Sequence, residues 1–407
     1  MLRKSILLLA LIGLLAGGIN AADPYAYVIN TSGETLSKIN LTTNMVTNNM
    51  LTLGSDILSS PNQIIIRDSL AYVLLSVTDE IQIINLKTES TVGWIDLPNG
   101  SNPFWMAFYN DQYLYVTLMV DDALVKVDVT IKMIVQTTPI GKSPEGILIY
   151  KDRAYVAITA YDFSTYTWGQ GKVAVYDLSA DTVLSSIEIL TSTNPQFVDV
   201  DANGIIHCVC TGNYSSVRGT VFLIDPEIEA AFNIVSLGGD PSLLAIGADN
   251  KVFLSAGGWA ADGEIFSYDA FTYEVYHDSA NPIYVDSGAM GIVAFQDTTA
   301  FACTFGDRII RINSNGDKIN TYTMGDGPIH VAFDYVPGDA NGDWEVNVGD
   351  AVYLVNFTFK GGAAPAFPRW RANANGDVSI NVGDAVYLVN YAFKGGPAPI
   401  IGPLWVN

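Results

Sequence analysis

The chain has 407 residues, and its 42 acidic side chains outnumber its 20 basic ones, which gives a formal net charge of −22. A protein this acidic does not bind nucleic acid by neutralising phosphates, and it is not drawn to an anionic membrane surface. Because 49% of the residues are hydrophobic and only 15% are charged, the chain can bury a large core, and disorder by composition is excluded.

The N-terminal segment has the layout of a secretory signal peptide. Arg3 and Lys4 precede an apolar run from Ile6 to Leu15, and small residues follow up to Ala22. We expect residues 1–22 to be removed and the mature protein to be secreted, to the extracellular space or the cell surface. No other apolar run approaches the roughly 18 residues that a spanning helix needs, so no transmembrane segment is expected in the mature chain.

A strand that ends in Asp or Asn recurs seven times after the signal peptide, with a period of about 45 residues. The terminal residues are Asn40, Asn85, Asp128, Asp177, Asp225, Asp269 and Asn313. Periods of roughly 40–50 residues made only of strands and turns are typical of propeller blades, each a four-stranded sheet. The Asx side chain closes the turn after the strand by bonding the backbone two residues on, so we expect it to be structural and not catalytic.

Two other kinds of strand recur with the same period, and each forms a column when the seven repeats are aligned. One is an apolar strand opened by a proline, at Pro61, Pro103, Pro144, Pro195, Pro241 and Pro328, with Ser287-Gly288 in the seventh place. The other is an aromatic-aliphatic strand such as Ala71-Tyr72-Val73. The chain enters on the second strand of a blade and leaves on an innermost strand at Ile329 to Phe333. These columns predict an all-β, seven-bladed β-propeller over residues 23–336, whose first blade takes its inner strand from the far end of the domain.

Three consecutive blades carry aromatic residues in the loops between their second and third strands. These residues are Tyr161, Tyr166, Trp168, Tyr214 and Trp259. Such loops share one face of a propeller, where exposed rings beside Asn, Asp and Ser suit a glycan or a surface protein. The alternative is that the rings pack on one another to order long loops.

The cysteines and histidines do not form a recognisable catalytic pattern. Cys208, Cys210 and Cys303 are interpreted as small buried hydrophobes, because Cys208 and Cys210 lie two apart on one strand, where a disulfide is strained. His207 is expected to make a hydrogen bond in the core, and His277 and His330 lie at scattered repeat positions. We therefore assign no catalytic residue.

The repeats resemble a known family. Ala154-Tyr155-Val156, Val173 to Leu178 and the step Gly141-Lys142-Ser143-Pro144 are similar to the Tyr-Val-Thr-Asn (YVTN) class of seven-bladed β-propellers. The resemblance covers roughly residues 24–335 and implies a cell-surface interaction module, although a minority of related rings are enzymes.

The chain changes character after Pro337, where an oxygen-rich loop followed by an apolar stretch occurs twice, 34 residues apart. Positions 1, 3, 5, 7, 9 and 12 of the first loop are Asp339, Asn341, Asp343, Glu345, Asn347 and Asp350. The same positions of the second loop are Asn373, Asn375, Asp377, Ser379, Asn381 and Asp384. This is the ligand spacing of EF-hand-type calcium loops, with position 7 contributing its carbonyl. Two Ca²⁺ sites are predicted, and the second is expected to be weaker because Asn373 has no charge.

The tail, residues 338–407, resembles a type I dockerin module, a tandem of calcium loop and helix, over about residues 338–399. The helices are expected to end at Gly361-Gly362 and Gly395-Gly396. The resemblance implies a cohesin-like partner, whose contacts fall on loop positions 10 and 11 and further along each helix. In this chain those residues are Val348, Gly349, Lys360, Val382, Gly383 and Lys394. Another copy of the chain is the alternative partner.

Three functions remain open on the sequence alone. The first is a secreted, non-catalytic scaffold in which the propeller recognises a ligand and the calcium-loaded tail attaches it to an extracellular assembly. The second is a self-assembling structural protein that forms filaments or a surface layer through contacts between tail and propeller. The third is an enzyme of lyase or lactonase type, borne by the same tail and acting in the central channel.

Overall fold

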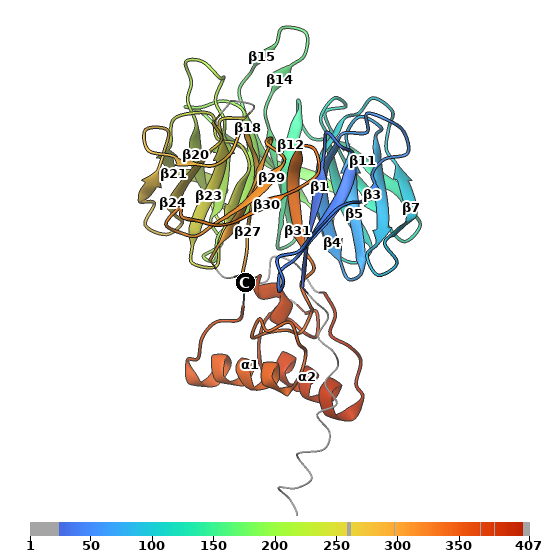
Figure 1. Cartoon of the computed structure of the whole chain (residues 1–407). Coiled ribbons are helices and arrows are strands. Elements are labelled where there is room, and N and C mark those ends of the chain that lie inside the picture. The colour runs from blue at the N-terminus through green and yellow to red at the C-terminus, as the bar shows by residue number, and fades with distance from the viewer. Residues whose placement is uncertain (1–23, 259–261, 297, 367, 378, 402–407) are drawn as a thin grey trace, which may run out of the picture.

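The structure is a computed structural model that describes residues 24–258, 262–296, 298–366, 368–377 and 379–401 (Figure 1). Within these residues the strands form a ring of seven antiparallel sheets, and the two longer helices lie together on one side of the ring. The predicted signal peptide lies outside the described residues. The predicted seven-bladed propeller is confirmed.

Each blade has four strands, ordered from the innermost strand outward. Blade 1 comprises β31 (Pro328–Phe333), β1 (Tyr25–Asn30), β2 (Thr35–Asn40) and β3 (Val46–Thr52); blade 2, β4 (Pro61–Arg67), β5 (Leu70–Leu75), β6 (Glu80–Asn85) and β7 (Ser90–Asp96); blade 3, β8 (Pro103–Phe108), β9 (Tyr113–Leu118), β10 (Ala123–Asp128) and β11 (Met133–Pro139); blade 4, β12 (Pro144–Tyr150), β13 (Arg153–Ile158), β16 (Lys172–Asp177) and β17 (Thr182–Glu188).

The remaining blades keep this order, with one irregularity. Blade 5 comprises β18 (Pro195–Val200), β19 (Ile206–Cys210), β20 (Thr220–Asp225) and β21 (Ala230–Ser236); blade 6, β22 (Leu244–Ile246), β23 (Lys251–Ala256), β24 (Glu264–Asp269) and β25 (Val275–His277), with β26 (Ile283–Tyr284) also paired to β24; blade 7, β27 (Ala289–Ala294), β28 (Ala300–Thr304), β29 (Arg308–Ile312) and β30 (Lys318–Thr323). A short hairpin, β14 (Tyr161–Asp162) and β15 (Thr167–Trp168), extends from blade 4.

The ring closes as predicted, because β1 pairs with β31 at the end of the domain, with Ala26 opposite Phe333. The prolines open the innermost strands of five blades. Blade 6 differs: β22 begins at Leu244, three residues after Pro241. There the backbone of Ser242 and Leu243 bonds to Ser255 outside the regular ladder, at 2.8 and 3.0 Å.

The predicted turns after the third strands are also confirmed. The side chain of Asn85 accepts from Lys87 N and Thr88 N at 2.9 and 3.1 Å, and Asp269 accepts from Phe271 N and Thr272 N at 2.9 and 2.8 Å. Comparable bonds occur at the other five positions. These Asx residues close hairpins, so their recurrence reflects the fold.

The core lies between adjacent blades. Ile81 of blade 2 and Val116 of blade 3 belong to one cluster of fully buried side chains, and similar clusters occupy other spaces between blades. Cys208, Cys210 and Cys303 are free thiols with 0% exposure, as the sequence predicted. Each blade thus buries both faces against its neighbours.

The tail contains α1 (Val348–Lys360), the 3-10 helix η1 (Arg369–Ala372) and α2 (Val382–Lys394). Figure 1 shows η1 near the ring and α1 and α2 farther from it. Both long helices begin at an Asn with a capping box and end at a glycine with φ of 64°, Gly361 and Gly395. The predicted helix ends are confirmed.

Candidate functional sites

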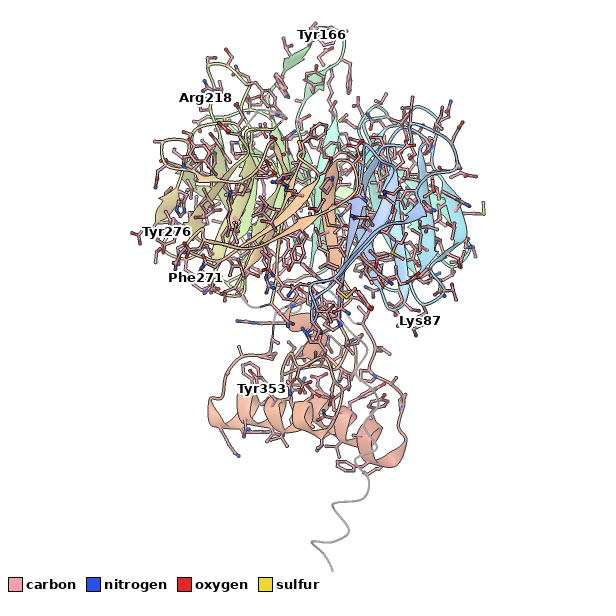
Figure 2. The ribbon with its side chains drawn as sticks, viewed as in Figure 1. Lys87, Tyr166, Arg218, Phe271, Tyr276 and Tyr353 are labelled. Carbon is pink, nitrogen blue, oxygen red and sulfur yellow. The ribbon has the colours of Figure 1, made fainter. Side chains whose placement is uncertain are left out.

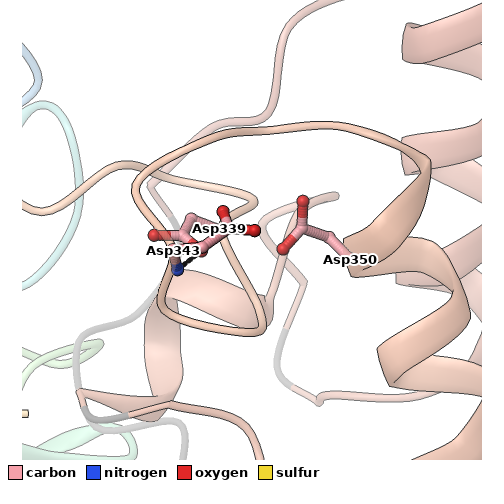
Figure 3. A group of neighbouring side chains, drawn as sticks. All are labelled: Asp339, Asp343 and Asp350. Atoms are coloured by element: carbon pink, nitrogen blue, oxygen red, sulfur yellow. Dashed lines mark hydrogen bonds between the residues drawn. The ribbon is translucent and has the colours of Figure 1, made fainter. Parts of the chain in front are cut away.

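The first candidate calcium loop gathers three carboxylates. One oxygen from each of Asp339, Asp343 and Asp350 lies within 4.8 Å of the others (Figure 3). Asp339 and Asp350 are fully buried, and Asp343 is exposed. Burial chiefly, together with nearby Asp343, raises the pKa of Asp350 to about 6. A divalent cation among these oxygens would offset that cost.

Local hydrogen bonds fold the loop around these oxygens. Asp339 Oδ1 accepts from Gly342 N at 2.8 Å, and Asp350 Oδ2 accepts from Asn347 N at 2.9 Å. Asn341 and Glu345 lie on the same loop, where Asn341 Nδ2 donates to Asp343 at 2.8 Å and Glu345 accepts from Asn347 Nδ2 at 3.2 Å. The six predicted positions therefore belong to one compact turn.

Position 6 of this loop departs from the usual pattern. Trp344 has a φ of 68°, a left-handed conformation for which EF-hand loops use glycine. Its ring stacks on Tyr335 of the propeller at 5.7 Å between centroids and 9° between planes. This packing offsets the backbone strain and attaches the loop to the ring.

Sequence reasoning missed Arg371, which connects the tail to the propeller. This side chain is 0% exposed, donates to Asp339 and to Gln296 of blade 7, and lies over the Tyr335 and Trp344 rings at 5.2 and 5.1 Å. Burial lowers its pKa to about 10. Two arginines flank Trp370, and no sequence signal shows which of them is buried.

The second candidate loop repeats the first with fewer charges. Asp377 accepts from Ser379 N at 2.8 Å, and Asp384 accepts from Asn375 N and Asn381 N at 3.2 and 2.8 Å. Asn373 is fully buried, and its Oδ1 atom has no hydrogen-bond partner within the described residues. A cation bound at position 1 would satisfy that oxygen.

The predicted partner-binding residues lie on two similar surfaces. Val348 and Val382 are 41% and 40% exposed, and Lys360 and Lys394 are exposed at the helix ends. Gly349 and Gly383 are half-buried beside the N-caps. The same faces expose further apolar side chains, namely Val352, Phe359, Val386, Val389 and Phe393. Ala351, Leu354, Ala385 and Leu388 are buried in the small core of the tail.

The aromatic loops lie on the face of the ring that is remote from the tail. Figure 2 shows Tyr166 and Arg218 there, opposite Tyr353 of α1. Trp168 brings Tyr161 and Tyr214 together, with ring centroids at 5.0 and 5.7 Å. The rings therefore pack on one another, yet Tyr166 and Tyr214 remain 75% and 55% exposed. Trp259 lies outside the described residues.

The central channel holds a cavity of about 480 Å³, lined by all seven innermost strands and by residues 368–370 of the tail. Trp105 contacts Phe197 and His330 inside it, at 5.0 and 5.2 Å between ring centroids. Burial lowers the pKa of His330 to about 4, so it is neutral at pH 7. His207 is buried and bonds Tyr268 at 2.6 Å, which confirms its predicted core role.

Comparisons with known proteins support the fold alone. No protein-family model and no curated protein matches the chain. Among solved structures it is similar to hydrazine synthase of Kuenenia stuttgartiensis, at 14% identity and a TM-score of 0.54 over 69% of this chain and 91% of that chain. It is also similar to a functionally unknown protein from Desulfotomaculum acetoxidans, at 13% identity and a TM-score of 0.57 over 76% of this chain and 98% of that chain.

The Pan2 WD40 domain of Neurospora crassa matches at 13% identity and a TM-score of 0.51, over 68% of this chain and 82% of that chain. At these identities only the propeller architecture is shared. Within the described residues, no helix is long and apolar enough to cross a membrane.

Proposed function

We propose that this chain is a secreted, non-catalytic binding protein, in which a YVTN-type propeller recognises a ligand and a calcium-loaded, dockerin-like tail attaches it to an extracellular assembly. The observation that carries the proposal is the duplicated tail. Two loops with calcium-ligand spacing are each followed by a helix that exposes the same apolar face, including Val352 on α1 and Val386 on α2.

Calcium fits the donor sets of both loops. The ligands are carboxylate, amide, hydroxyl and backbone oxygens, which hard cations prefer. In the first loop Asp339, Asp343 and Asp350 converge, and in the second the buried Oδ1 atom of Asn373 has no hydrogen-bond partner among the described residues. We therefore assign one Ca²⁺ to each loop, with the second site the weaker.

The paired faces support a partner that either helix can bind. Exposed valines at equivalent places, 54% for Val352 and 55% for Val386, give α1 and α2 nearly the same surface. We take the partner to be a cohesin-like domain of another protein. Because these helices lie away from the ring (Figure 1), the propeller leaves room for such a domain.

The lining of the central cavity is mostly apolar, and residues 368–370 of the tail line its end nearest the helices. A lyase or lactonase would need several polar groups held around a substrate in this space. Gln63, Asp199, Asn250 and His330 line the cavity, so an enzyme acting there is the alternative function.

The test is binding of purified cohesin domains to the full chain, in calcium and in chelator, with light scattering of the chain alone. Val352→Asp or Val386→Asp singly should leave calcium-dependent binding, because the other face remains, and the double variant should abolish it. Val135→Asp on β11, a valine that is 45% exposed, is the matched control. Calcium-dependent filaments without cohesin binding would instead favour self-assembly.

A further inference from the structure

The face of the ring remote from the tail is built differently in its two halves. In blades 1, 2, 3 and 7 an acidic residue just before the third strand caps the loop that leads to the next blade. Asp79 accepts from Asn102 N at 2.9 Å, Asp122 from Ser143 N at 2.8 Å and Asp307 from Gly327 N at 3.0 Å, and Glu34 bonds Ser59 N. Blades 4, 5 and 6 have Gly171, Gly219 and Gly263 at this position.

The same three blades carry the long connections between second and third strands. These are residues 159–171, 211–219 and 257–263, against residues 31–34, 76–79, 119–122 and 305–307 elsewhere. The first of them forms the β14–β15 hairpin, which stands above the ring with Tyr166 at its tip (Figure 2). On this face, blades 4, 5 and 6 therefore have long loops where the other four blades have tight, capped loops.

Buried polar atoms without hydrogen-bond partners gather beneath these loops. Among the described residues they include Glu145 Oε2, Ser192 Oγ, Thr193 Oγ1, Thr220 Oγ1 and both side-chain polar atoms of Asn194. Glu145 is 6% exposed and Asn194 1%. Buried polar groups in folded proteins are nearly always paired, so a cluster of unpaired ones indicates bound water or a ligand at this place.

Main-chain bonds place Thr193, Asn194 and Thr220 in one neighbourhood, and Glu145 belongs to it through the side chain of Gln196. Thr211 N donates to Asn194 O at 3.1 Å, and Gly212 N donates to Thr193 O at 3.2 Å. Thr220 pairs with Cys210 across the β19–β20 ladder. Tyr214 is 55% exposed as a residue, but its phenol is desolvated, and this together with the carboxylates of Glu145 and Asp240 raises its pKa to about 12.

Aromatic rings border the polar cluster. Tyr161, Trp168 and Tyr214 form a continuous row, with centroids 5.0 and 5.7 Å apart. A row of rings beside buried hydrogen-bonding groups offers both a stacking surface and fixed polar contacts to one ligand.

We propose that this half of the face binds a neutral carbohydrate, with sugar rings stacked on Trp168 and Tyr214 and sugar hydroxyls bonded to Asn194 and Glu145. The proposal rests on the recognition role proposed above for the propeller. A hydroxyl group both donates and accepts, and the side-chain amide of Asn194, which interacts with the phenol of Tyr214, offers one group of each kind.

Other ligand classes fit the same groups less well. A metal ion needs acceptors only and leaves Asn194 Nδ2 unused. A phosphate or nucleic acid would meet the acidic side chain of Asp240, which lies near Tyr214. Burial raises the pKa of Glu145 to about 8, so at pH 7 it is mostly protonated and can itself donate to a sugar oxygen.

The test uses the full chain in calcium and titrates cello-, xylo-, manno- and chito-oligosaccharides of four to six units by calorimetry. We expect at least one series to bind and Trp168→Ala to weaken it at least tenfold with the ring still folded. Asn194→Asp should also weaken it at least tenfold, and it should lower the melting temperature because it places a carboxylate at a position that is 1% exposed. Phe271→Ala is the matched control, because this aromatic residue is 38% exposed on the ring near the tail (Figure 2).

The proposal is overturned if none of these oligosaccharides binds, or if the strongest binder is equally tight in Trp168→Ala. If Asn194→Asp fails to fold, Trp168→Ala decides. Binding of calcium or of a protein alone at this face would also overturn it. Cohesin binding, measured on the same samples, separates the two proposals. If cohesin binds but no sugar does, only the carbohydrate proposal is refuted. If sugar binds but cohesin does not, only the proposed role of the tail is refuted.

Discussion

At the residue scale, the spacing of the sequence predicted the first-loop acids, and the structure brings three of them together. It did not predict Arg371, whose guanidinium reaches Asp339 from a segment 32 residues away and lies against two aromatic rings. Such a pair depends on how the tail packs on the ring. Local pattern carries no information on that packing, so the buried arginine could be found only in three dimensions.

Arg371→Met should destabilise the tail by about 3–5 kcal/mol, because it leaves the buried carboxylate of Asp339 without its partner. The loss should be greater in chelator than in calcium, since a bound cation compensates the same carboxylate. Urea unfolding in both buffers measures this difference. The matched control is Arg369→Met, at a less buried arginine two residues away, and equal losses in the two variants would contradict the assignment.

Glu145 gives a prediction for pH. The ordinary pKa of a glutamate is 4.5, and burial, which opposes ionisation, raises the pKa of Glu145 to about 8 in the fold. Below pH 4.5 the carboxyl is protonated in both the folded and the unfolded chain and imposes no penalty. Between pH 4.5 and 8 the unfolded chain releases the proton that the folded chain retains, so stability falls as pH rises, by at most about 1.4 kcal/mol per pH unit.

Glu145→Gln should therefore become progressively more stable than the parent from pH 4.5 to pH 8, by a few kcal/mol in total, with a constant difference above that. Thermal unfolding across this range measures it. Glu188→Gln, at an exposed glutamate on β17, should track the parent throughout. A difference that does not change with pH would show that the carboxyl stays ionised.

At the scale of the element, period and turn chemistry predicted most of the architecture. The seven Asx turns, the closing pair of β1 and β31, and both helix ends could be placed from the sequence because local bonds or backbone conformation fix them. The strands of blade 6 were harder to predict, because β25 and β26 both pair with β24 at its outer edge and its inner strand begins three residues after the proline. The aromatic loops were located, but not the polar groups beneath them, because those come from different blades.

The two proposed calcium loops should differ in their affinity for Ca²⁺. Asp343→Ala removes one of three acids from the first loop, and we expect it to weaken that site about tenfold or more, which is ~1.4 kcal/mol. Asp377→Ala acts on the second loop, whose first position is Asn373. It should therefore change only the lower-affinity of the two calcium-binding steps. Calorimetric calcium titration of the full chain resolves both steps. Equal affinities of the two single-loop variants would contradict this ranking.

At the scale of the whole molecule, the tail is packed on the propeller and is not merely tethered to it. Trp344 stacks on Tyr335, Arg371 bonds Gln296, and Arg67 of blade 2 donates to Ile401 O at 3.3 Å. The cavity within the ring is lined by both parts. No pattern in the sequence indicates this docking, because an acidic chain with a Val336-Pro337 junction is equally compatible with a loose linker.

Removing calcium should therefore unfold the tail while the ring persists. All the proposed ligands lie after Pro337, whereas the blades are held by ladders and cores to which none of these ligands belongs. Each site occupied at about 100 times its Kd contributes about 2.7 kcal/mol to the stability of the tail. Hydrogen exchange on the full chain should show α1 and α2 losing protection in chelator, with magnesium-supplemented chelator as the control for ionic strength and for a less selective site.

The same hydrogen-exchange experiment also tests the contact between the tail and the propeller. The strands at the tail end of the channel should lose a little protection, because residues 368–370 no longer cover them, and the strands on the aromatic face should lose none. Loss of protection across all seven blades would mean that the tail holds the ring closed. Unchanged exchange in α1 and α2 would mean that calcium supplies no folding energy to the tail, and would remove the basis for its calcium-dependent attachment.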